Sequence, residues 1–164
     1  FLNWGIFLQS GGFFMFLDAS IAENKRIPFD APEAESELVA GYFTEYSGLK
    51  FGMFFMAEFI EMVTIGAIVT ILFVGAWHIP FLPSATLLSW LYFLGTNWAN
   101  LILMFIHIGV FFANVIFFIW FQMIIRWTLP RFRYDQIMKL GWKILLPLSL
   151  ANILITGLVI LAVN

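Results

Sequence analysis

Seven carboxylates fall between residues 18 and 45 of this 164-residue chain, close beside Lys25 and Arg26. Most of them belong to residues 22–48, AENKRIPFDAPEAESELVAGYFTEYSG, which lie between two long apolar segments. An ordinary connection between helices does not need this density of acids, so we expect function to concentrate here. The alternative is a solvated acidic loop without a chemical role.

The loop is expected to open as an extended turn and to continue as a short helix. Pro28 disfavours helix at Ile27, and Asp30 with Glu33 three residues later has the spacing of a capping box. Glu33 and Glu37 are then neighbours on one face. Crowded carboxylates tend to have raised pKa values, which suits proton exchange.

Glu58 and Glu61 lie inside the next apolar run, 51–77. They are three residues apart, so in a helix they share a face. Counted from residue 51, they lie about 10 and 15 Å along the helix axis. Because a carboxylate at mid-membrane costs about 2.5 kcal/mol or more, both should face protein or water. The pair indicates a proton path or, alternatively, a structural hydrogen bond between helices.

Two further acids extend this line. Glu45 is joined to the run containing Glu58 through Gly48-x-x-x-Gly52, which would make loop and span a continuous acidic path. Asp18 lies near the end of the first apolar run. It is either a residue that reaches out to the membrane surface or the start of the same path.

Polar residues also mark the second half of the chain. Asn100, His107 and Asn114 are seven residues apart and predict a polar stripe, which serves either helix packing or proton conduction. His107 is a weak metal or haem candidate, because His78 lies on another element and no CxxCH or HExxH is present. Residues 126–143, RWTLPRFRYDQIMKLGWK, have the composition of a membrane-boundary anchor, with Asp135 as an ion-pair partner of the arginines.

Composition places these residues in a membrane. The chain is 62% hydrophobic and 11% charged, against roughly 25% charged in soluble domains. It has no cysteine and therefore no disulfide or thiolate-held iron–sulfur cluster of its own. Its apolar start without Met suggests a fragment. Nothing indicates a nucleotide loop, a nucleophile with its base, or nucleic-acid binding.

The predicted fold is an all-α membrane protein with about four transmembrane helices in one polytopic domain, residues 1–164. Each run suits a helix that crosses the apolar core of about 30 Å. The segment between the second and third spans is apolar, but two prolines and a glycine break it, so we expect it to lie at the bilayer surface rather than form a fifth span. The spans are expected at 1–21, 51–77, 99–125 and 144–163, joined by connections at 22–50, 78–98 and 126–143.

Charge predicts the orientation. The connection 78–98 contains no Lys, Arg, Asp or Glu. With four spans, the connections 22–50 and 126–143 share one face, which the positive-inside rule assigns to the cytoplasm. The first is net negative and the second net positive, so they either attract each other or bind a shared partner. All eight cations lie in these two connections or at their edges: Lys25, Arg26, Lys50, Arg126, Arg131, Arg133, Lys139 and Lys143.

AENKRIPFDAPEAESELVAGYFTEYSG, followed by FGMFFMAEF, resembles the quinone loop of the H subunit of bacterial NADH:quinone oxidoreductase, respiratory complex I. LPRFRYDQIMKLGWKILLPL resembles the last cytoplasmic loop and final helix of the same subunit. The resemblance covers essentially the whole chain and implies the C-terminal half of that subunit, in the bacterial inner membrane.

The resemblance implies a membrane subunit that forms part of the quinone channel and couples quinone reduction to proton translocation. Quinone would be a substrate, while FMN and iron–sulfur clusters would belong to partner subunits of the hydrophilic arm. No covalent catalytic residue and no metal is implied in this chain. The implied quinone-proximal residues are Glu23, Arg26, Phe29, Asp30, Glu33, Glu35 and Glu37. The implied proton path is Asp18, Glu45, Glu58 and Glu61, and the implied subunit-docking residues are Arg131, Arg133, Tyr134 and Asp135.

Two positions qualify the resemblance. The role of Glu61 rests on depth and spacing alone. Many relatives carry Lys where Asn114 stands, so an intramembrane charge is absent here.

Two other functions share the same features: the membrane anchor of an energy-converting hydrogenase, and an independent proton or cation transporter. A transporter would ordinarily show the inverted repeat and broken helices that this sequence lacks.

Overall fold

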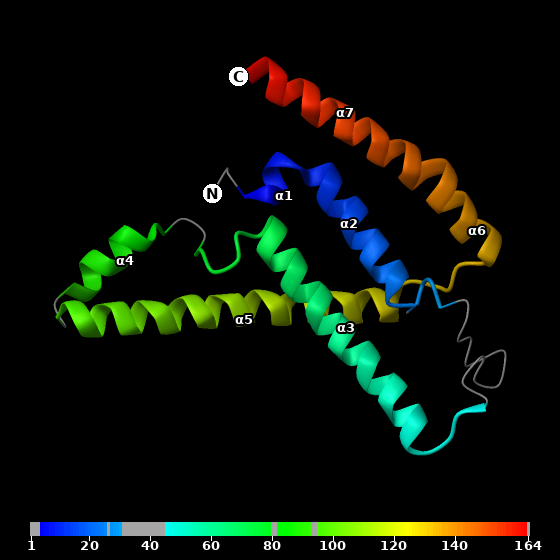
Figure 1. Cartoon of the computed structure of the whole chain (residues 1–164), viewed down its shortest axis with the longest axis horizontal. Coiled ribbons are helices and arrows are strands. Elements are labelled where there is room, and N and C mark those ends of the chain that lie inside the picture. The colour runs from blue at the N-terminus through cyan, green and yellow to red at the C-terminus, as the bar shows by residue number, and fades with distance from the viewer. Residues whose placement is uncertain (1–3, 26, 31–44, 80–81, 93–94, 164) are drawn as a thin grey trace.

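The computed structural model describes residues 4–25, 27–30, 45–79, 82–92 and 95–163. Within these ranges all regular structure is helical, which confirms the predicted all-α fold. Figure 1 shows that the long helix Leu49–Phe73 crosses the long helix Thr96–Thr128, and that Leu146–Val163 runs beside the shorter helix Ser10–Glu23. Among the described residues, three helices are long and apolar enough to cross a membrane: Leu49–Phe73, Asn97–Thr128 and Tyr134–Ala162.

The first expected span is divided. Residues 5–23 form α1, Gly5–Leu8, and α2, Ser10–Glu23, with a break at Gln9, whose backbone has φ −134° and ψ 56°. The 14 residues of α2 extend about 21 Å, less than the apolar thickness of a bilayer. The count of four transmembrane helices therefore stays a prediction.

Helix α3, Leu49–Phe73, follows the predicted run but ends four residues earlier than expected. Gly75 and Ala76 both have left-handed backbone, with φ +75° and +56°, and the N–H of Ala76 donates to the carbonyl of Thr70. A side chain at Gly75 would also meet the indole of Trp4, since an added Cβ would lie 2.9 Å from its Nε1 atom. Glycine therefore permits both the helix stop and the contact with the N-terminal segment.

The core lies where α2, α3 and α5, Thr96–Thr128, meet. Helices α3 and α5 cross at Gly66, where an added Cβ would be 3.4 Å from the carbonyl oxygen of Val115. Small residues allow such close approach between apolar helices. The buried cluster consists of Phe13, Leu17, Ile21, Phe29, Ile65, Val69 and Phe118.

Helix α5 ends at Thr128 because Leu129 precedes Pro130 and takes an extended conformation, φ −92° and ψ 134°. Only residues 129–133 of the expected connection 126–143 are non-helical. The chain then continues through α6, Tyr134–Lys139, a π-helix at Leu140–Leu145, and α7, Leu146–Val163. Pro147 lacks an N–H and its ring crowds the preceding turn, which gives a physical reason for a wider π turn just before it.

The uncharged connection forms one short helix within its described part, α4, Ser84–Leu91. Its eight residues extend about 12 Å, too little to cross a bilayer, and α4 packs against the first part of α5. This favours the surface-lying segment over a fifth span.

Candidate functional site

The acidic and basic connections meet directly in the structure. The N–H of Phe132 donates to the carbonyl of Pro28 at 3.0 Å. The rings of Phe29 and Phe132 pack edge to face with centroids 5.7 Å apart. We call residues 27–30 together with 129–133 the loop junction. Attraction between the two connections was one of two predicted outcomes, and the observed contacts are a backbone hydrogen bond and an aromatic pair.

Burial at the loop junction is high for a charged region. Phe29 is 9% exposed and belongs to the core, so its ring has a packing role whatever else it contacts. Asp30 and Arg131 are each half-buried, and the Nη1 atom of Arg131 is fully enclosed. Charged groups in such surroundings interact more strongly than groups in bulk water.

Asn24 is a buried polar residue that no sequence pattern singled out. It lies just past the end of α2, is 4% exposed, and its Oδ1 atom has no hydrogen-bond partner among the described residues. A buried acceptor without a partner is costly. The sequence places Asn24 at a helix end among charged residues, and this context predicts an exposed side chain, not a buried one.

The other expected quinone-loop and path residues are less enclosed. Glu23, Asp18 and Glu45 are exposed, the first two on α2 and the third just before α3. Asp18 therefore does not lie in the core formed by the same helix. Four expected residues, Arg26, Glu33, Glu35 and Glu37, fall outside the described residues, as does the predicted helix capped by Asp30.

Glu58 and Glu61 are both half-buried on α3. Counted from Leu49, where α3 begins, they lie about 14 and 18 Å along its axis. Their helix is apolar, and Phe55 and Phe59 on the same helix pack with ring centroids 6.2 Å apart. The structure thus places two carboxylates near the middle of a candidate membrane span, as the spacing indicated.

The basic connection carries one described ion pair. The Nε atom of Arg133 lies 3.4 Å from Oδ2 of Asp135, which confirms the predicted pairing. Both side chains are exposed, by 82% and 68%. Gln136 accepts a hydrogen bond from the N–H of Arg133 at the start of α6, and Tyr134 is exposed beside them. This arrangement presents charge to the surroundings rather than burying it.

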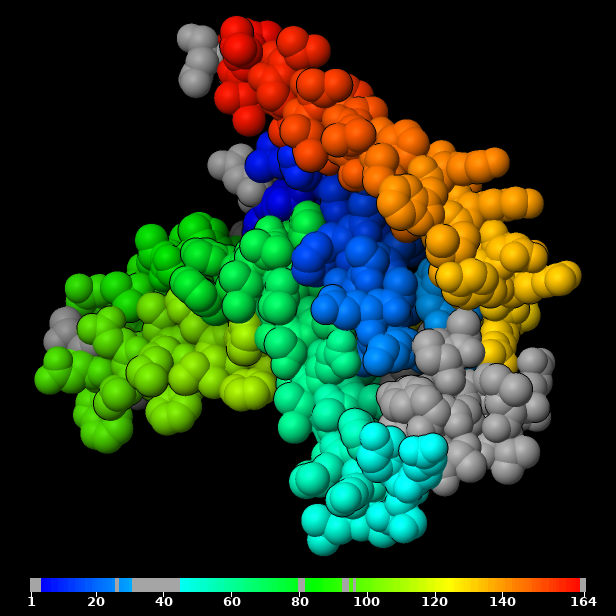
Figure 2. Space-filling view, turned by 45° about the vertical axis from the view of Figure 1, so that its right-hand side comes forward, coloured from blue at the N-terminus to red at the C-terminus, as the bar shows by residue number. Residues whose placement is uncertain are grey.

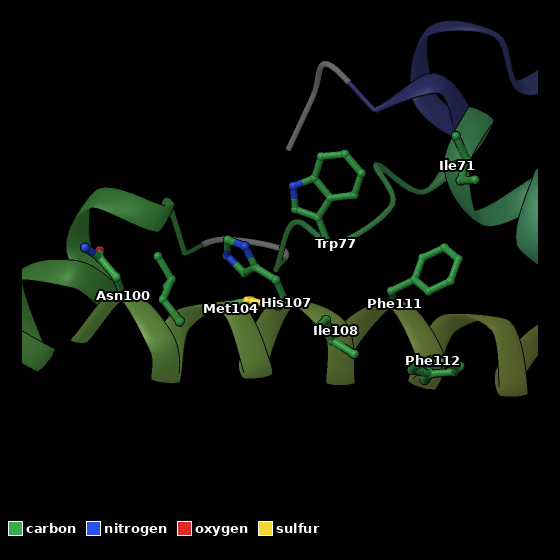
Figure 3. A pocket seen from close by; sticks show the side chains of 9 residues that line it. Ile71, Trp77, Asn100, Met104, His107, Ile108, Phe111 and Phe112 are labelled. Atoms are coloured by element: carbon green, nitrogen blue, oxygen red, sulfur yellow. The ribbon is translucent and has the colours of Figure 1, made fainter. Parts of the chain in front are cut away.

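A pocket lies at the opposite end of α5 from the loop junction (Figure 3). Its volume is about 710 Å³, and its lining contains no Asp, Glu, Lys or Arg. The side chains of His107 and Trp77 project into it from α5 and from the turn after α3. The nine lining residues are Ile71, Trp77, Asn100, Leu103, Met104, His107, Ile108, Phe111 and Phe112.

The predicted polar stripe is divided between this pocket and helix packing. Asn100 and His107 line the pocket, whereas the Nδ2 atom of Asn114 donates to the carbonyl of Ala76 at 3.3 Å. For Asn114 this contact favours the packing alternative. The rings of His78 and His107 lie 6.5 Å apart, and in the described part of the chain no three His, Cys, Asp or Glu side chains group closely enough to hold a metal ion.

Long apolar helices, two carboxylates within one of them and charged residues gathered beyond their ends define an all-helical integral membrane protein. Comparison with known proteins gives the family. The model of the NADH dehydrogenase family matches residues 2–157, and the chain belongs to that family. This confirms the resemblance inferred from the two sequence blocks.

Comparison with individual relatives supports the same family. The chain is 47% identical to the NADH-quinone oxidoreductase H subunit of Flavobacterium johnsoniae over 98% of its length. It is 46% identical to the H subunit of Bdellovibrio bacteriovorus and 50% identical to one of Koribacter versatilis, each over 96% of its length. The aligned region spans only 42–43% of the length of these three relatives.

Proposed function

We propose that the chain is part of a membrane subunit of proton-pumping NADH:quinone oxidoreductase. It would help to form the quinone channel and couple quinone reduction to proton translocation. The observation that carries the proposal is the identity of 46–50%, over nearly the whole chain, to relatives that are named as the H subunit of this enzyme. The enzyme, rather than this chain alone, would carry out the reaction.

The quinone channel would be shaped by the acidic connection, with Glu23, Arg26, Phe29, Asp30, Glu33, Glu35 and Glu37 near the quinone. The loop junction supports this assignment, because the contact between Phe29 and Phe132 holds the start of the acidic connection against the core. A channel wall needs such a fixed base if it is to position a substrate. The headgroup would then meet charged side chains, and its tail would meet apolar helix surfaces.

Proton transfer would continue along Asp18, Glu45, Glu58 and Glu61. Glu58 and Glu61 support this role, since both are half-buried in an apolar helix. An ionised carboxylate there is disfavoured by about 2.5–3.5 kcal/mol on insertion scales. A proton taken up when a nearby group becomes more negative would offset that cost. Redox events near the loop would in this way change the protonation of α3.

The partners would be the other subunits of the complex, with FMN and iron–sulfur clusters in the hydrophilic arm and quinone as the shared substrate. The exposed ion pair of Arg133 and Asp135 supports a docking role for Arg131, Arg133, Tyr134 and Asp135. Residues 22–50 and 126–143 would face the cytoplasm, with the spans in the bacterial inner membrane. All four expected spans would form one polytopic domain.

Two other functions are less well supported. The anchor of an energy-converting hydrogenase would share the buried carboxylates but would have no quinone, and nickel in the large soluble partner would reveal it. An independent transporter would move cations without partners. The names of the relatives favour the quinone enzyme over both.

The test uses the complete enzyme in native membranes. A photoreactive quinone analogue should label residues 22–50 or the adjacent helix ends, and excess quinone should prevent that labelling. Glu58→Gln should lower quinone-dependent turnover while the complex still assembles, and Glu61→Gln, one turn further along α3 in the same proposed path, should lower it as well. Absence of label from this chain, in membranes where another quinone site is labelled, would contradict the proposal.

A further inference from the structure

We propose that Lys139, Trp142 and Lys143 form a binding site for the headgroup of an anionic phospholipid, independent of the quinone reaction. The two lysines would contact the phosphate, and Trp142 would lie at the level of the glycerol and headgroup. The evidence consists of their depth, their exposure and their arrangement on one helix.

Helix length sets the depth of these residues. The candidate span Tyr134–Ala162 has 29 residues and so extends about 43 Å, longer than the apolar core of about 30 Å. Residues 144–163 contain no charged side chain and are sufficient to fill that core by themselves. Lys143 therefore lies at the boundary of the apolar core, and Lys139 lies about 6 Å further out, where headgroups are found.

The two lysines lie on the surface of the described structure. Both are exposed, and within the described ranges neither has an acidic partner. Figure 2 shows side chains that project outward from the yellow-to-orange stretch, which includes α6 and the π-helix. Two cations four residues apart on a helix repel each other. An anion placed between them removes this repulsion.

The chemistry favours a lipid phosphate over other anions. Trp142 is 66% exposed, and exposed Trp at a span boundary is typical of the headgroup level. Below it the helix continues as an apolar surface, with Leu146, Leu150 and Ile153 exposed by 43%, 55% and 66%. Such a surface accepts an acyl chain, so cationic and apolar groups follow one another in the order that a phospholipid requires.

The π-helix contributes to this arrangement. It includes residues 140–145, so Trp142 and Lys143 lie within it and Lys139 directly precedes it. A π turn is wider than an α turn, and residues four apart remain neighbours on nearly the same line. Because Pro147 has no N–H to donate to the carbonyl of Lys143 in an α-helical pattern, the proline fixes the turn that aligns the two lysines.

The experiment uses the complete protein in its native assembly, transferred to phosphatidylcholine nanodiscs. One sample contains photoactivatable phosphatidylglycerol and the other contains photoactivatable phosphatidylcholine at the same mole fraction. Labelled peptides from residues 134–150 are quantified for the unchanged protein, for Lys139→Gln/Lys143→Gln and for Lys139→Arg/Lys143→Arg. Lys50→Gln, an exposed lysine near the start of α3, controls for loss of charge elsewhere.

Phosphatidylglycerol should label this segment in preference to phosphatidylcholine. The double glutamine variant should lose about fivefold or more of that label, because each lysine near an anionic surface contributes about that factor. The double arginine variant should keep it. Equal labelling by the two lipids would overturn the proposal, and so would a loss of label in Lys50→Gln equal to that in the double glutamine variant.

Discussion

Replacing Phe132 with alanine is expected to loosen the loop junction. The ring of Phe132 packs edge to face on Phe29, which is 9% exposed. Such an aromatic pair contributes about 0.5–1.5 kcal/mol beyond its buried area. Truncation of a fully buried Phe costs about 3–5 kcal/mol, and Phe132 is only partly buried. We therefore expect a loss of about 2–3 kcal/mol for the local contact.

Amide hydrogen exchange measures this loss directly. The N–H of residue 132 is bonded to the carbonyl of Pro28 at 3.0 Å, so its exchange reports opening of the junction. A loss of about 2–3 kcal/mol should lower its protection factor by about 30- to 140-fold. Protection in the middle of α3, for example near Val69, should not change, because the contact is local.

Phe105→Ala is the matched control. Phe105 lies on α5 and is 69% exposed, so the same truncation removes little packing within the protein. Its effect on protection at residue 132 should stay below about threefold. If Phe132→Ala also changes protection by less than this, the aromatic contact does not hold the two connections together, and the reasoning from the structure is refuted.

Three other changes test separate contacts. Gly66→Leu should destabilise the protein by about 1–3 kcal/mol, because its Cβ would lie 3.4 Å from a backbone carbonyl of α5. Gly109→Leu, which has open space around it, is the control and should show no such loss in thermal unfolding. Similar Tm values for the two variants would contradict the close crossing of α3 and α5. Asn24→Leu removes a buried acceptor that has no partner among the described residues, so it should raise the free energy of unfolding by about 1 kcal/mol or more. A loss of stability would show that the oxygen is paired in the assembled protein. In a double-mutant cycle, Arg133→Gln and Asp135→Asn should couple by less than about 1 kcal/mol, since the pair is exposed, and a larger coupling would show that the assembly buries it.

Most of the helices that were predicted correctly from the sequence were recognised by their apolar runs. Helices α3 and α5 begin and end within a few residues of expectation, because a long apolar segment in lipid must satisfy its own backbone hydrogen bonds. Each end of α5 lies three residues outside the predicted span 99–125, for a local reason. Gly95 and Pro130 are the first strong helix breakers on either side, and the helix extends almost to both.

The irregular parts of the helices were not predictable in the same way. The break at Gln9 coincides with a hydrogen bond from its Nε2 to Oγ1 of Thr156, which is 147 residues away in sequence. A local pattern cannot contain such a contact. The π-helix before Pro147 has a local cause, but proline predicts a kink in general and does not specify a π turn.

Local spacing also explains which site residues were predicted well. Asp135 lies two residues from Arg133 and pairs with it, and Asn114 on its polar stripe contacts a neighbouring segment. Burial depends instead on which helices cross. Phe29 joins the core, and Asn24 is enclosed, because α2, α3 and α5 meet beside them. No sequence pattern indicated where α2, α3 and α5 meet, and none predicted the pocket at the other end of α5.

The two halves of α3 differ in a way that bears on the proposed proton path. Its buried residues, Met62, Ile65, Gly66, Val69 and Thr70, all belong to the second half. Glu58 and Glu61 lie before them and are only half-buried. In the proposed path, the exposed part of each carboxylate would face another protein segment or water, because an ionised group in contact with lipid is costly. The chain spans 42–43% of the length of its relatives, so the remainder of such a protein, together with neighbouring subunits, is where the other side of the proposed path should be sought.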